Sequence, residues 1–133
     1  EKACAAWGKC LKRNPKIEVD MTENNVSEGG LAYIAGFLRK FWVHPRLDLR
    51  SMGFGADGMR PLSLQLADRR MRTVTTLYLS NNELGPEGAM HLAHVLERSY
   101  SLQELDVSGC GMEDEGVRVV AEALQLNQRL EYM

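Results

Sequence analysis

Two pairs of side chains have the types and the spacing that could support chemistry. Glu104 and Asp106 lie two residues apart in an alternating stretch, so both carboxylates face one side of a strand. That side is expected to be open to water, so nothing would raise the pKa of one carboxyl as general acid catalysis requires. His91 and His94 lie three residues apart on a helical pattern, a spacing that can hold zinc, but the only third ligand in sequence reach is Glu87. We therefore expect no catalytic residues and no metal site.

Motifs and cysteines lead to the same expectation. The sequence contains no phosphate-binding loop, no nucleophile elbow and no paired-cysteine zinc motif. Its cysteines are Cys4, Cys10 and Cys110, an odd and sparse set that argues against a disulfide scaffold and for a reducing, intracellular and cytoplasmic setting. The sequence thus predicts a protein that is not an enzyme, with no cofactor and no small-molecule substrate.

Composition excludes further classes. The 133 residues include 16 basic and 18 acidic side chains, for a net charge of −2, which does not suit a strongly basic nucleic-acid binder. Apolar residues make up 44% of the chain, near the globular average. The longest apolar stretches, residues 30–37 and 117–121, are too short to span a bilayer. We expect neither nucleic acid as a partner nor a membrane span.

The elements that position these residues come from an internal repeat. One copy is defined by Val74, Leu77, Leu79, Asn82, Leu84, Gly88, Leu92 and Leu96. Adding 28 to each number gives Leu102, Leu105, Val107, Cys110, Met112, Gly116, Val120 and Leu124, so apolar positions stay apolar and the glycine stays glycine. Earlier copies lie 30 and then a further 28 residues upstream. We expect one domain, 1–133, with a partial copy 1–15, full copies 16–43, 44–73, 74–101 and 102–129, and the start of another at 130–133, as part of a longer stack.

Each copy has two halves with different periods. Its first half alternates, as in the segment 77–79, which predicts a strand with one buried face. Its second half has apolar residues every three to four positions, as in Leu92, Val95 and Leu96, which predicts an amphipathic helix. A strand, a loop and a helix in 28 residues describe a leucine-rich repeat. The predicted fold is α/β, a right-handed leucine-rich-repeat solenoid with parallel strands on the concave face and helices on the convex face.

Two segments allow a closer comparison. Residues 76–85, TLYLSNNELG, and 102–112, LQELDVSGCGM, resemble the ribonuclease-inhibitor-like subfamily of leucine-rich repeats, which alternates asparagine and cysteine at the position of Asn82 and Cys110. The 101–109 and 123–127 segments also look like the solenoid of the capping-protein–Arp2/3–myosin-I linker family and the sensor domains of nucleotide-binding innate receptors. Met52 departs from the asparagine or cysteine of the pattern.

That position is expected to form a structural ladder through the stack. Asn24 and Asn82 should point inward and bond backbone groups of the turn, because a buried amide requires hydrogen-bond partners. Cys110 should be a buried core residue at the same position. Met52 cannot make such bonds, so we expect the ladder to be interrupted there.

Side chains between the buried leucines should point away from the core. We predict that this exposed strand face binds a partner protein through Glu18, Asp20, Arg46, Asp48, Arg50, Tyr78, Glu104, Asp106 and Tyr132. Five carboxylates and two arginines give it a charge of −3. The aspartates are also explained as ordinary solvated residues, whereas tyrosine and arginine are common anchors of protein interfaces.

Charges also follow the helix ends. Acids gather where helices should begin, and bases gather where helices should end, including Arg69, Arg70, Arg72 and Arg98. Helix dipoles favour this arrangement, which is the simpler explanation. The alternative is a basic rim that binds acidic or phosphate-rich partners.

The predicted function is that of a non-catalytic module or scaffold that binds another protein, because repeat stacks present extended binding surfaces. The resemblance also implies alternatives: a regulatory or sensor repeat region of a larger signalling or actin-regulatory protein, or a GTPase-activating regulator of the Ran type. No residue of this chain can be assigned the Ran-type role.

Overall fold

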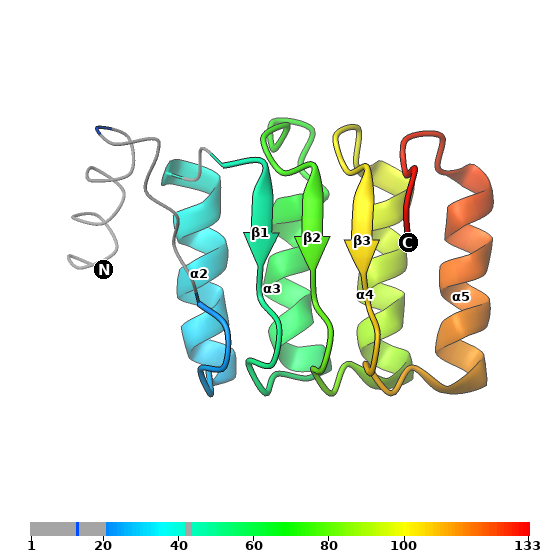
Figure 1. Ribbon diagram of the computed structural model, residues 1–133, viewed down its shortest axis with the longest axis horizontal. Helices are drawn as coiled ribbons and strands as arrows, with labels where there is room; N and C mark the ends of the chain where they lie inside the picture. Colours follow the sequence, from blue (N-terminus) through cyan, green and yellow to red (C-terminus); the bar gives the residue numbers. More distant parts are fainter. Residues whose placement is uncertain (1–12, 14–20, 42–43) are drawn as a thin grey trace.

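The computed structural model describes residues 13, 21–41 and 44–133. Four helices and three short strands alternate along the described part of the chain. In order they are α2 (Glu28–Phe41), β1 (Arg46–Asp48), α3 (Ala56–Leu66), β2 (Thr76–Tyr78), α4 (Gly85–Arg98), β3 (Glu104–Asp106) and α5 (Glu113–Leu126). The strands form one layer and the helices another, and each element lies beside its counterpart from the next copy (Figure 1).

The sheet is parallel and has the order β1-β2-β3, as the repeat predicts. Its register matches the repeat step, because Leu47 pairs with Leu77 and Leu77 pairs with Leu105. Tyr132 continues this ladder through an isolated parallel bridge to Glu104. Equivalent residues of successive copies therefore lie side by side.

The core lies between the two layers. Leu47, Leu77 and Leu105 reach it from the strands and are almost completely buried. Helix residues at one repeated position, such as Leu62 and Leu92, are buried there as well. Burial of this apolar surface, shared between neighbouring copies, is the main source of stability in a stack of repeats.

A glycine at one repeated position lies at a close contact in each helix, and in α3, α4 and α5 that contact includes the preceding helix. At Gly116 an added Cβ would lie 2.9 Å from the Cβ of Ala89 and 2.9 Å from the Cβ of Met112. At Gly88 it would lie 2.8 Å from the Cβ of Leu84. The repeated glycine is therefore a packing requirement between and within copies.

A residue with positive φ recurs at one position of the repeat: Glu23, and then Ser51, Asn81 and Gly109 after the three strands. In the first three copies this conformation turns the N–H of the residue toward the next copy, where it donates to the carbonyls of Arg50, Ser80 and Ser108. Glycine occupies the position only at 109, so the sequence gives little indication of this turn.

Asn82 is 1% exposed and joins two copies. Its Nδ2 donates to the carbonyls of Leu49 at 2.8 Å and Leu79 at 2.7 Å, and its Oδ1 accepts from the N–H of Met52 at 2.9 Å. Met52 is buried as an apolar residue, and its side chain has no amide to bond the Leu49 carbonyl of its own copy. Asn82 of the next copy bonds that carbonyl. Cys110 is buried, and its Sγ donates to the Leu79 carbonyl at 3.3 Å.

Asn24 corrects one expectation, since its side chain is exposed rather than inward-pointing. Its Nδ2 donates to the carbonyls of Met21 and Thr22, both in its own turn. Asn82 differs because its amide also bonds the preceding copy, at Leu49. The amide of Asn24 thus closes a local turn and does not join the buried ladder.

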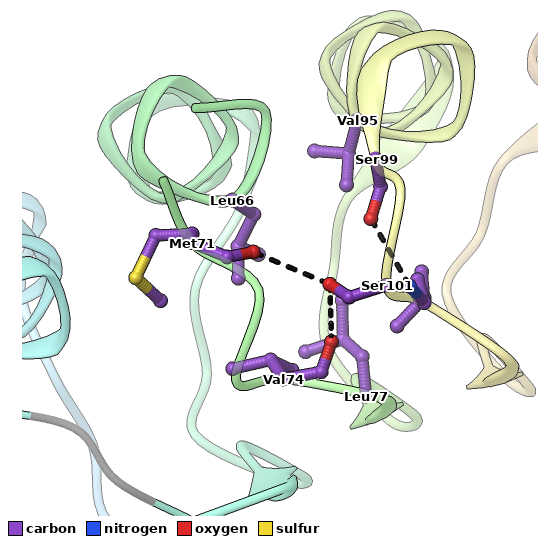
Figure 2. Close-up of a pocket in the computed structure, with 8 residues that line it drawn as sticks. Leu66, Met71, Val74, Leu77, Val95, Ser99 and Ser101 are labelled. Carbon is purple, nitrogen blue, oxygen red and sulfur yellow. Dashed lines mark hydrogen bonds between the residues drawn. The ribbon is translucent and has the colours of Figure 1, made fainter. Parts of the chain in front are cut away.

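The copy 44–73 is longer because the connection after its helix is longer. Since α3 ends at Leu66, Arg69, Arg70 and Arg72 lie beyond the helix and not in its last turn. Hydrogen bonds from Ser101 hold this connection in place. Its hydroxyl lies 3.2 Å from the carbonyl oxygen of Met71 and 2.8 Å from that of Val74 (Figure 2). A hollow of about 10 Å³ remains beside these residues, close to the lower limit for one water molecule.

Candidate protein-interaction surface

Six polar or aromatic side chains on the outer side of the sheet form what we call the strand-face cluster. They are Arg46, Asp48, Arg50, Tyr78, Glu104 and Asp106. The strand register aligns Asp48, Tyr78 and Asp106 in one row and Glu104 with Tyr132 in another. Because side chains alternate along a strand, burial of the leucines leaves these residues on the opposite side.

Asp48 is held by two arginines. Its Oδ1 lies 2.8 Å from Arg50 Nε, and its Oδ2 lies 2.7 Å from Arg50 Nη2 and 3.2 Å from Arg46 Nη2. The side chain of Asp48 is only 14% exposed. Partial burial alone would raise the pKa of Asp48, but the hydrogen bonds and charge of Arg50 outweigh it and lower the pKa. The bidentate contact fixes the planes of both groups.

Tyr78 is the centre of the cluster. The guanidinium carbons of Arg46 and Arg50 lie 5.0 Å and 5.5 Å from its ring centroid, within the range of cation–π contacts. Its hydroxyl donates to Glu104 Oε1 at 2.8 Å. This bond and partial burial raise the pKa of Tyr78, because both favour the protonated phenol. Contacts from both neighbouring strands therefore fix the ring.

Asp106 borders the cluster on β3. Its Oδ1 accepts from the hydroxyl of Ser108 at 2.7 Å and from the N–H of Ser108 at 3.0 Å. These bonds, with a smaller contribution from Ser80, lower the pKa of Asp106. Asp106 is therefore ionised at neutral pH, the opposite of what a general acid requires.

Of the other proposed site residues, the structure describes Tyr132 alone. Tyr132 is 70% exposed, and its backbone joins the edge of β3 through Gln103 and Leu105. Glu18 and Asp20 lie outside the described residues. The sequence placed the six cluster residues on one face but gave no contacts among them; the two-residue spacing of Arg46, Asp48 and Arg50 was the available signal, since it puts them on the same side.

Two features are absent from the described part of the chain, a cluster of metal-ligating side chains and a membrane-spanning helix. Among residues 13, 21–41 and 44–133, no group of three or more His, Cys, Asp or Glu side chains is placed to hold a metal ion. Within the same residues, no helix has both the length and the apolar character needed to cross a bilayer.

Sequence comparisons agree with the repeat. A family model described as "Leucine Rich repeat" matches residues 70–93 and 99–121. The chain is 24% identical over 132 residues to the Cep78 homolog of Drosophila melanogaster and 29% identical over 125 residues to NACHT, LRR and PYD domains-containing protein 14 of Mus musculus. These alignments cover 96% and 92% of this chain but only 15% and 12% of the relatives. The matches support a leucine-rich repeat protein that corresponds to a small part of its relatives.

A structural comparison supports the same fold. The solved structure named "Leiomodin-1 Actin-Binding Site 2" superposes with a TM-score of 0.77 over 94% of this chain and 74% of that one. The sequences are 19% identical, so the similarity is one of fold. The alternating parallel strands and helices fit a leucine-rich-repeat fold.

Proposed function

We propose that the strand-face cluster binds another protein and that the chain acts as a non-catalytic interaction module. The observation that carries this proposal is the fixed position of Tyr78 between two arginines and Glu104. An aromatic ring that is already ordered loses little side-chain entropy on binding. Tyrosine and arginine are also the residues that most often dominate interface energy.

The charge distribution indicates what a partner should present. Asp48 is neutralised by its contacts with Arg46 and Arg50, which leaves a net positive charge beside β1. Glu104 and Asp106 leave negative charge beside β3. A complementary partner carries an acidic group opposite β1 and a basic group opposite β3, and the tyrosine ring lies between them.

We infer a solenoid of the ribonuclease-inhibitor-like subfamily, supported by the buried Asn82 and Cys110 at one repeated position. A longer stack is supported by α5, where Val117 is 55% exposed although its counterpart Ala89 is fully buried beneath α5. A further repeat packed on α5 would cover Val117 in the same way.

The test is affinity capture from a cell extract with the full-length protein, read by mass spectrometry. One variant carries Arg46→Glu, Arg50→Glu and Tyr78→Ala. The matched control carries the same types of change at exposed helix positions, Arg39→Glu, Arg60→Glu and Tyr33→Ala. Circular dichroism establishes that both fold.

The proposal predicts that a partner is lost from the strand-face variant and retained by the control. Retention of every partner by both variants would exclude the strand-face cluster as the binding surface. Loss from both would show a dependence on overall charge.

A further inference from the structure

A second surface lies at the edge of the molecule where helices end and strands begin, at the top in Figure 1. Two open hollows share Tyr100 there. One, of about 340 Å³, is lined by Ala67, Arg69, Glu97, Arg98 and Tyr100. The other, of about 410 Å³, is lined by Arg72, Thr75, Tyr100, Ser101, Gln103 and Arg129. We call Arg69, Arg72, Arg98, Arg129 and Tyr100 the basic rim.

The charge of the rim differs from that of the rest of the chain. Four arginines and one carboxylate, Glu97, line the two hollows, which gives +3 in a chain whose net charge is −2. None of the four arginines forms an ion pair with a described residue. The adjacent Arg70, in contrast, is paired with Asp68 at 2.8 Å. The rim thus concentrates positive charge that the described fold does not neutralise.

Hydrogen bonds hold the turn that contains Tyr100 on both sides of this residue. Before it, the hydroxyl of Ser99 accepts from the N–H of Leu102 at 3.2 Å. After it, the hydroxyl of Ser101 is bonded to the carbonyl of Met71 in the preceding copy and to that of Val74 in its own copy (Figure 2). The guanidinium carbon of Arg69 lies 5.3 Å from the ring centroid of Tyr100, and Tyr100 remains 51% exposed. Arg72 Nε donates to the Arg69 carbonyl at 3.3 Å. The rim therefore combines an ordered aromatic ring with guanidinium groups that form no ion pair with a described residue.

We propose that the basic rim binds an acidic segment of a partner polypeptide, which crosses Tyr100 and places a carboxylate in each hollow. Guanidinium groups bind carboxylates through paired hydrogen bonds, and an exposed tyrosine packs against a peptide backbone or an apolar side chain. Two separate hollows joined by an aromatic ring suit side chains that branch from one chain. A nucleic acid would carry its charges along a continuous phosphate backbone and not on side chains that branch from it, so it fits two separate hollows less well.

This surface is distinct from the strand-face cluster, so the two proposals can fail separately. The test uses the full-length protein and fluorescence anisotropy of a labelled ten-residue oligoglutamate, with oligoglutamine as the neutral comparison. One variant carries Arg72→Glu and Arg129→Glu, and the matched control carries Arg39→Glu and Arg60→Glu, which are exposed on helices. A milder pair, Arg72→Gln with Arg129→Gln, replaces the first if circular dichroism shows that it does not fold.

We expect oligoglutamate to bind, oligoglutamine not to bind, and the rim variant to weaken binding about tenfold or more. The control should change affinity less than about twofold. Tyr100→Ala should weaken binding several-fold without altering the charge.

Other outcomes overturn the proposal. They are the absence of oligoglutamate binding, an equal loss in the rim and control variants, or no effect of Tyr100→Ala. Tighter, rim-dependent binding of phosphatidylserine vesicles or of a single-stranded oligonucleotide would assign the surface to a membrane or to nucleic acid instead.

Discussion

The hydroxyl of Tyr78 on β2 donates a 2.8 Å hydrogen bond to Glu104 Oε1 on β3. The two residues are one repeat apart and diagonal in the strand register, since Tyr78 pairs with Asp106 and Glu104 pairs with Thr76. The bond is therefore a contact between copies that fixes the central side chain of the strand-face cluster.

This contact predicts a titration result. Glu104→Gln removes the negative charge that stabilises the protonated phenol, so the pKa of Tyr78 should fall toward its usual value of about 10. The measurement is an ultraviolet difference titration in which each protein is compared with the same protein carrying Tyr78→Phe. An unchanged phenol titration in Glu104→Gln would contradict the hydrogen bond.

Acid should weaken the contact between Asp48 and its arginines. Because Arg50 lowers the pKa of Asp48, the ionised form favours the folded state, and its contribution is present above pH about 4. That contribution is lost as the pH falls from about 4 through the lower pKa of the folded protein. In urea unfolding at several pH values, the free energy of unfolding should therefore fall less steeply with acid for Asp48→Asn than for the unmodified protein. Arg50→Gln should reduce this pH dependence similarly. An unchanged pH dependence in both variants would refute the stabilising contact between Asp48 and Arg50.

The buried amide of Asn82 should be important for stability. Asn82→Ala leaves the Leu49 carbonyl and the Met52 N–H without their side-chain partner, which should lower the free energy of unfolding by about 1–3 kcal/mol. Asn24→Ala is the matched control, because that side chain is exposed and should cost less than about 1 kcal/mol. Chemical denaturation measures both, and equal losses would argue against the ladder.

The close approach of helices predicts opposite effects of one substitution at two glycines. Gly116→Ala places a Cβ 2.9 Å from that of Ala89 and should destabilise the protein by about 1–3 kcal/mol. Gly36→Ala, in α2, should stabilise it by about 0.5–1 kcal/mol, because among the described residues the added Cβ would meet nothing within 4 Å beyond its chain neighbours and its own helix backbone. Thermal unfolding distinguishes the signs; stabilisation by Gly116→Ala would mean that α4 and α5 are not held at this distance.

The repeat pattern predicted the parts of the fold that depend on apolar spacing. Leu77 and Leu105 could be assigned to buried strand positions because a period of two separates the faces of a strand. The pattern also placed Tyr78 and Arg50 on one exposed face. It could not predict how they touch, because rotamers of long side chains depend on the shape and charge of their neighbours.

The repeat pattern did not predict the exposed environment of the Asn24 side chain. Its position in the repeat is the same as that of Asn82, but Asn82 also bonds Leu49 in the preceding copy, whereas Asn24 bonds carbonyls of its own turn. The positive φ of Glu23 and Ser51 could not be predicted from the sequence either, since neither residue type favours that conformation. In both cases the outcome depends on contacts between copies, which no single copy of the repeat encodes.

The bond from the Met52 N–H to Asn82 has a consequence for hydrogen exchange. This backbone hydrogen belongs to the copy 44–73, but the acceptor that protects it is a side chain of the copy 74–101. It can exchange with solvent when the later copy opens, even if the strand and helix of its own copy stay intact. The protection of the Met52 amide therefore reports the local opening free energy of the neighbouring copy.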